Sequence, residues 1–162
     1  MSLKETTLTR DTLFNGIVFN VERQDVRLAD GSESKRDIVR HIGGVGVLAR
    51  RPDGQFLLVR QYRKAVEAEV LEIVAGMREP DEPAKDTARR DLEEETGHQV
   101  TSLTPLGTVF VSPGYTDEVD HLFFAEITEI PRGNRLDADE RLTVEAYSRT
   151  ELETMMIENH IQ

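Results

Sequence analysis

The chain has 162 residues, with 31 acidic and 20 basic side chains and no cysteine. This length suits one domain, and the lack of cysteine excludes disulfides and thiolate metal sites, so we expect a protein of the reducing cytoplasm. A net charge of −11 argues against a nucleic-acid partner, which needs clustered basic residues, and no apolar run approaches the length of a membrane span.

Residues 1–42 are predicted to form a small antiparallel sheet. Apolar and polar residues alternate from Phe19 to Leu28, and Asp30-Gly31 is a strong turn signal before a return strand that starts at Lys35. Residues 43–162 are expected to form the larger region of the same folding unit.

Further strands are predicted on both sides of a central helix. Val70 to Met77 is mostly apolar and is predicted to be one strand, in which Glu72 either pairs with a basic residue or has a functional role. Pro105 indicates an edge or a break in the strand that follows the helix. The remaining predicted strands are residues 43–48, 55–61, 100–111, 119–126 and 142–147, and a second helix is predicted over residues 149–159.

The central helix is indicated by Ala88, Leu92 and Thr96, which recur every four positions. Gly97 is the expected end of this helix, and Asp86 or Thr87 the expected N-cap.

Three carboxylates share one face of this helix. Asp91, Glu94 and Glu95 are three and four positions apart, whereas Glu93 points elsewhere. Like charges at this spacing repel each other, so the pattern indicates either a solvated acidic face or a site for a hard cation such as Mg²⁺ or Mn²⁺.

The spacing around these carboxylates resembles the signature of the Nudix hydrolase family. The matching residues are Gly76, Glu82, Arg90, Leu92, Glu94, Glu95 and Gly97; Asp91 stands where the family has Glu, and His98 where it has an aliphatic residue. The resemblance implies an α/β fold, a Nudix α/β/α sandwich with a mixed sheet, preceded here by the small N-terminal sheet.

The family resemblance also implies roles for individual residues. Gly76, Glu82, Arg90 and Gly97 would support the site, with Glu82 paired to Arg90. Glu94 would act in catalysis as well as in metal binding, and the base is left open between Glu140, Asp139 and Glu118, with Glu140 at the expected loop position. The implied ligands of Mg²⁺, or of Mn²⁺, are the Ala75 carbonyl, Asp91, Glu94, Glu95 and Glu140.

Two segments are similar to the ADP-ribose pyrophosphatase subgroup. These are Val59 to Arg63, VRQYR, and Ser112 to Glu118, SPGYTDE, which contains Pro113. The similarity implies substrate contacts from Arg63, the Met77 amide, Glu118 and Arg36, the last contributed across a homodimer.

The sequence therefore predicts a metal-dependent hydrolase that converts a nucleoside diphosphate sugar, ADP-ribose first, into AMP and ribose 5-phosphate. Two alternatives stay open. One is a Nudix hydrolase for another nucleotide sugar or dinucleotide, such as GDP-mannose, and the other is a non-catalytic module that binds ADP-ribose.

Overall fold

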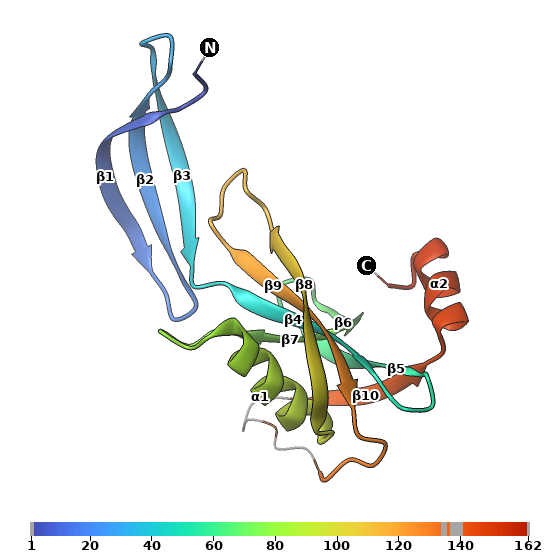
Figure 1. Ribbon diagram of the computed structural model, residues 1–162. Coiled ribbons are helices and arrows are strands. Elements are labelled where there is room, and N and C mark those ends of the chain that lie inside the picture. The colour runs from blue at the N-terminus through green and yellow to red at the C-terminus, as the bar shows by residue number, and fades with distance from the viewer. Residues whose placement is uncertain (1, 134–135, 137–140, 162) are drawn as a thin grey trace. The chain divides into compact units, whose positions relative to one another are not determined.

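The computed structural model describes residues 2–133, 136 and 141–161. They fall into two compact units. The described residues within 1–43 and 109–120 form the first, and those within 44–108 and 121–162 form the second. Figure 1 shows the course of the chain through both units. The family resemblance also implies that residues 1–42 form the contacts of the homodimer, and this role stays a prediction.

The first unit contains an antiparallel sheet, as the alternating pattern predicted. Its strand order is β1-β2-β3, and Gly31 adopts a φ of 89° at the turn between the last two strands. Residues 115–117 join β3 through backbone hydrogen bonds, including Val39 N–H to the Tyr115 carbonyl at 2.7 Å. The strands are β1 (Thr6–Asn15), β2 (Phe19–Arg27) and β3 (Glu33–His41).

The second unit is built on a larger sheet with the order β10-β5-β4-β9-β8. Strand β6 pairs with β5 and β7 with β4, both antiparallel. Because β8 lies at the end of this order and continues through Pro105, the proline marks an edge strand. The strands are β4 (Gly44–Arg50), β5 (Phe56–Arg63), β6 (Ala68–Glu72), β7 (Val74–Met77), β8 (Val100–Phe110), β9 (Val119–Ile127) and β10 (Leu142–Tyr147).

One strand prediction was wrong. Val70 to Met77 is not a single strand, because the chain leaves β5 after Glu72 and joins β4 at Val74. The apolar run is continuous in the sequence, but the change of partner from β5 to β4 depends on strand pairing, which periodicity does not report.

The two helices, α1 (Ala84–Thr96) and α2 (Arg149–Ile157), cover opposite faces of this sheet (Figure 1). Neighbouring side chains on β5 show the two layers, because successive residues of a strand point to opposite faces. Val59 packs in one core cluster with Leu92 of α1, and Leu58 packs in another with Leu152 of α2. This arrangement confirms the α/β/α sandwich.

Helix α1 confirms most of the sequence pattern. Ala88, Leu92 and Thr96 are all buried, and Gly97 ends the helix with a left-handed φ of 72°. The N-cap prediction was wrong, because the helix begins earlier, after Pro83, and has no side-chain cap. Proline at this position fixes an extended entry into the helix without any capping side chain.

Candidate active site

A cleft of about 400 Å³ lies where the end of β7 meets α1. Most of the site residues predicted in the second unit line it, so the end of β7 and the carboxylate face of α1 lie side by side. The lining residues are Arg63, Ala75, Gly76, Met77, Arg78, Glu79, Arg90, Asp91, Glu94 and Glu95.

The backbone of Gly76 closely approaches the side chain of Asp91. A Cβ atom built on Gly76 would lie 1.5 Å from Asp91 Oδ2 and 2.4 Å from its Cγ. Only glycine permits this approach, because any other residue would place a carbon atom where the carboxylate lies. The contact fixes the Asp91 carboxylate beside the Gly76 backbone, and Ala75 lines the same cleft.

The three helix carboxylates differ in exposure. Asp91 and Glu95 are 7% and 6% exposed, whereas the Glu94 side chain is 45% exposed. Glu93 points away, as predicted, and its carboxylate accepts a hydrogen bond from the Val100 backbone N–H.

This donor set has the chemistry of a hard-cation site. Ionised carboxylates are costly to bury unless they are compensated, and oxygen donors are those that Mg²⁺ and Mn²⁺ prefer. In the part of the chain that the structure describes, no three acidic or histidine side chains already converge as a metal cage. A bound cation would therefore use Asp91 and Glu95 together with backbone oxygen, water or a rotated Glu94.

Arg90 links the helix to the loop that precedes it. Its guanidinium donates to Glu82 through Nη2 at 3.0 Å and Nε at 3.2 Å, and to Asp91 Oδ1 at 2.5 Å. The predicted pair between Glu82 and Arg90 is present. Glu82 also accepts a hydrogen bond from the Thr87 hydroxyl at 2.8 Å. The hydrogen bonds from Arg90 and then Thr87 lower the pKa of Glu82 from 4.5 to about 2.

This depressed pKa predicts an acid-dependent contribution to stability. Because Glu82 titrates lower in the folded chain than in the unfolded one, its contribution is fully present above pH 4.5 and is lost as the pH falls through about 2. We expect the free energy of unfolding to fall less between pH 5 and pH 2.5 in Glu82→Gln than in the wild type. Urea titrations at both pH values measure this, and equal losses in the two proteins would contradict it.

Arg63 lines the cleft, but its guanidinium is already hydrogen-bonded to a neighbouring carboxylate. Glu72 accepts from Arg63 Nη2 at 2.6 Å and from Nε at 3.0 Å. This pair decides the open question about Glu72 in favour of a basic partner. The pair holds the guanidinium in one orientation, and its side chain remains 43% exposed.

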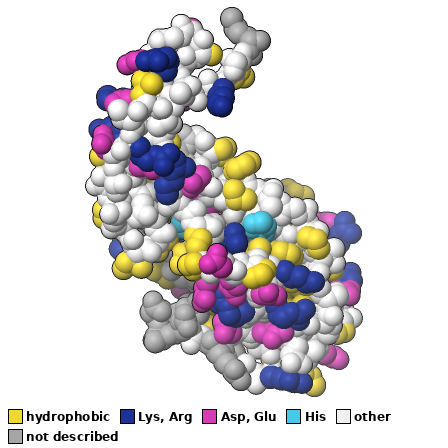
Figure 2. Space-filling view, turned by 60° about the vertical axis from the view of Figure 1, so that its left-hand side comes forward, with side chains coloured by type: hydrophobic (Ala, Val, Ile, Leu, Met, Phe, Trp, Pro, Cys, Tyr) yellow, Lys and Arg dark blue, Asp and Glu magenta, His cyan; other side chains and the backbone are white. Residues whose placement is uncertain are grey.

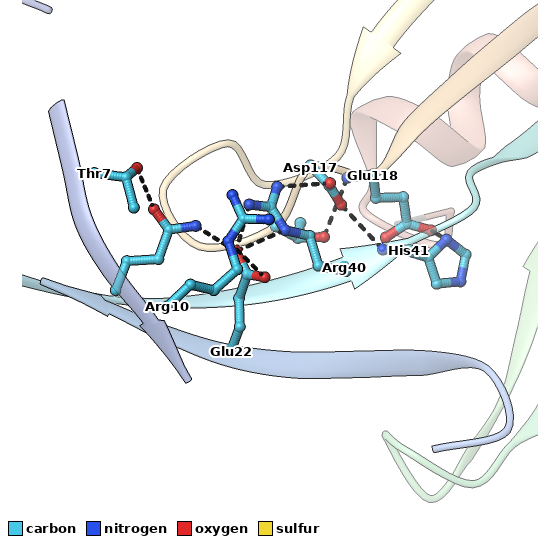
Figure 3. Close-up of polar contacts among 9 residues, drawn as sticks. Thr7, Arg10, Glu22, Arg40, His41, Asp117 and Glu118 are labelled. Carbon is cyan, nitrogen blue, oxygen red and sulfur yellow. Dashed lines mark hydrogen bonds and ion pairs between the residues drawn. The ribbon is translucent and has the colours of Figure 1, made fainter. Parts of the chain in front are cut away.

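Two predicted site residues, Arg36 and Glu118, belong to the first unit, which contains the sheet β1-β2-β3. Arg36 forms an ion pair with Glu5 at 2.6 Å, and Glu118 lies 3.2 Å from His41 Nδ1. Figure 3 shows Glu118 turned toward His41, beside the contact between Asp117 and Arg40. Glu140 and Asp139 lie outside the described residues.

Two lining residues were missed by the sequence analysis, Arg78 and Glu79. They follow Met77 directly, at the point where β7 leaves the sheet. Their signal was present, since charged residues just after a strand that ends at a site often face that site. It was overlooked because the family pattern specifies neither position.

On the face shown in Figure 2, acidic and basic side chains lie interspersed over the second unit and do not form one broad basic area. None of the helices among the described residues is long and apolar enough to cross a membrane.

Comparison with known proteins places the chain in a family. The model of the NUDIX domain matches residues 40–161. An ADP-ribose pyrophosphatase of Bacillus subtilis is 41% identical over 88% of this chain and 78% of the relative. A methanol dehydrogenase activator of Bacillus methanolicus is 39% identical over 85% of this chain and 75% of the relative.

Two further comparisons extend this result. A GDP-mannose pyrophosphatase of Yersinia enterocolitica is 31% identical over 78% of this chain and 71% of the relative. The crystal structure of an ADP compounds hydrolase has the same fold, with a TM-score of 0.82 at 24% identity over 98% of this chain and 85% of that structure. With its cleft and signature residues in place, the chain belongs to the NUDIX family.

Proposed function

We propose that this protein hydrolyses the diphosphate of a nucleoside diphosphate sugar, and that ADP-ribose, split into AMP and ribose 5-phosphate, is its first substrate. The observation that carries the proposal is the pair of buried carboxylates, Asp91 and Glu95, in a cleft that arginines also line. Asp91 lies against the Gly76 backbone. The relative at 41% identity, named an ADP-ribose pyrophosphatase, supports the choice of substrate.

The proposed metal ligands are Asp91, Glu94, Glu95, Glu140 and the Ala75 carbonyl, and Mg²⁺ or Mn²⁺ is the proposed ion. Such a cation would lower the pKa of a bound water and neutralise charge on the phosphate oxygens. The close contact between Gly76 and Asp91, and the hydrogen bond from Arg90 to Asp91, hold one of these carboxylates in a fixed position before substrate arrives. Such preorganisation reduces the reorganisation needed during the reaction.

The remaining roles combine the family resemblance with the positions of the described residues. In the reaction, a water oxygen bonds to one phosphorus, the bridging P–O bond breaks, and the water proton passes to a carboxylate. We assign that proton to Glu140, with Asp139 and Glu118 as the alternatives, and place Glu94 beside the reacting groups because it is the exposed carboxylate of the cleft. Arg63 and the Met77 backbone N–H would contact the substrate from the cleft wall.

A homodimer is part of the proposal, with Arg36 and Glu118 as substrate contacts. Every residue of β1 is exposed in the single chain. These residues include the large apolar side chains of Leu8, Leu13 and Phe14, and the last two are 52% and 53% exposed. Apolar residues gathered on one exposed strand are typical of a protein interface.

Self-association is measurable by light scattering coupled to gel filtration. We expect the wild type at twice the chain mass of 18.4 kDa, and Leu13→Glu or Phe14→Glu as monomers. Val66→Glu, at an apolar residue of the other unit that is 64% exposed, should remain dimeric. A monomeric wild type would remove the dimer from the proposal.

The substrate is tested by chromatographic detection of AMP after incubation with ADP-ribose and Mg²⁺, with and without EDTA. GDP-mannose is assayed in parallel, because relatives named GDP-mannose pyrophosphatases match at lower identity. AMP formation that EDTA abolishes supports the proposal. No release from ADP-ribose together with GMP release from GDP-mannose would replace the substrate and keep the reaction.

A further inference from the structure

Three arginines line the cleft, and carboxylates already balance two of them. Arg63 is paired with Glu72, and Arg90 is paired with Glu82 at 3.0 Å. An arginine held by a carboxylate offers less attraction to an incoming anion, because its charge is largely compensated by the acid beside it. The third arginine, Arg78, has a different environment.

Arg78 donates only to a neutral partner in the described structure. Its Nη2 donates to the backbone carbonyl of Glu82 at 3.0 Å. Its Nε is buried and has no hydrogen-bond acceptor among the described residues. Within residues 2–133, 136 and 141–161, no carboxylate forms an ion pair with Arg78. A carbonyl oxygen leaves the guanidinium charge uncompensated, and a buried N–H without an acceptor is costly.

The surroundings of Arg78 specify the ligand that would satisfy it. The same cleft contains the acidic groups of Glu79, Asp91, Glu94 and Glu95, which repel an anionic substrate. A diphosphate therefore needs cationic groups in the cleft as well as metal ions. The planar guanidinium presents parallel N–H donors that match two phosphate oxygens, which a lysine does not.

We propose that Arg78 is a substrate-binding residue that donates to the diphosphate of the nucleotide, a role that rests on the proposed function. It follows Met77 at the end of β7 and therefore reaches the cleft from the same wall as the proposed Met77 amide contact. Its bond to the Glu82 carbonyl keeps the side chain in place. Because Nε is buried, we assign the contact with phosphate to Nη1, which has no hydrogen-bond acceptor among the described residues, and to the second N–H of Nη2.

The test compares Arg78→Ala and Arg78→Lys with wild type. Steady-state kinetics with ADP-ribose give KM and kcat, and calorimetry in EDTA gives the dissociation constants of ADP-ribose and inorganic pyrophosphate without turnover. Hydrogen bonds to charged groups predict a rise of about 10- to 100-fold in KM and in both dissociation constants for Arg78→Ala. Arg78→Lys should weaken binding less than Arg78→Ala, because lysine keeps the positive charge but lacks the paired N–H donors of the guanidinium.

Lys85→Ala is the matched control, because it removes one positive charge from an exposed position on α1 that does not line the cleft. It should bind both ligands as the wild type does. A purely structural role would instead lower the melting temperature of Arg78→Ala and leave the dissociation constants within twofold, and this result would overturn the proposal.

The same measurements separate this proposal from the proposed function. If wild type does not hydrolyse ADP-ribose but binds pyrophosphate, and Arg78→Ala weakens that binding, the role of Arg78 stands and the ADP-ribose assignment fails. If wild type binds neither ADP-ribose nor pyrophosphate, the role of Arg78 is overturned as well.

Discussion

Glu95→Gln is expected to lower the rate of metal-dependent AMP release from ADP-ribose by about 10³-fold, which corresponds to about 4 kcal/mol of transition-state stabilisation. Glu95 is 6% exposed and lines the cleft beside Asp91. An amide of the same shape keeps the packing but removes the charge that attracts a cation. Initial rates over a series of Mg²⁺ concentrations measure the effect.

The Glu95 variant should remain folded. Asp91 and Glu95 are like charges one helical turn apart, so the amide relieves repulsion when no metal is bound. We therefore expect its melting temperature in EDTA to equal or exceed that of the wild type. Glu93→Gln is the control, because Glu93 lies on the same helix but faces away from the cleft and can still accept from Val100 N–H as glutamine. Equal activity of Glu95→Gln and wild type would exclude Glu95 as a metal ligand.

The sequence predicted the parts of the site that depend on local periodicity. Ala88, Leu92 and Thr96 are the buried stripe of α1, and the carboxylates of Asp91 and Glu95 follow from their spacing on the same helix. A helix repeats every 3.6 residues whatever lies around it, so residue spacing alone places these groups. Gly97 was also predictable from the local sequence, because a helix often ends at a residue with a left-handed φ, here 72°, which glycine adopts more easily than other residues.

Other features depended on which strands pair with one another, which residue spacing does not report. The division between β6 and β7 results from a change of pairing from β5 to β4, and neither strand is marked by a breaking residue. Glu72 could be assigned to Arg63 only when both lay on paired strands, nine residues apart. The structure also shows that Glu94 is exposed whereas Asp91 and Glu95 are buried. Their spacing on the helix does not distinguish the three carboxylates in this way.

Gly76→Ala is expected to have the other large effect. The new Cβ would lie 1.5 Å from Asp91 Oδ2, 2.4 Å from Cγ and 3.1 Å from Cβ of the same residue. Rotation of the carboxylate removes the first two overlaps, but it also moves the carboxylate from its place beside the strand. We expect AMP release to fall at least about 100-fold and the free energy of unfolding to fall by about 1–3 kcal/mol, as overpacking typically costs. Activity assays and urea unfolding measure the two effects.

A second substitution separates the clash from the loss of the ligand. In Gly76→Ala combined with Asp91→Ala, the carboxylate atoms that the new Cβ overlaps are gone and only the 3.1 Å contact with Cβ of residue 91 remains, so the double variant should be more stable than Gly76→Ala alone. It should nevertheless remain inactive, because the Asp91 carboxylate is missing. Gly114→Ala, where an added Cβ meets nothing within 4 Å, is the control and should unfold as the wild type does. Since residues in contact are not additive, the coupling between positions 76 and 91 should exceed the few tenths of a kcal/mol seen for distant pairs. Additive effects would mean that α1 and β7 can move apart, and that Gly76 does not fix the position of the Asp91 carboxylate.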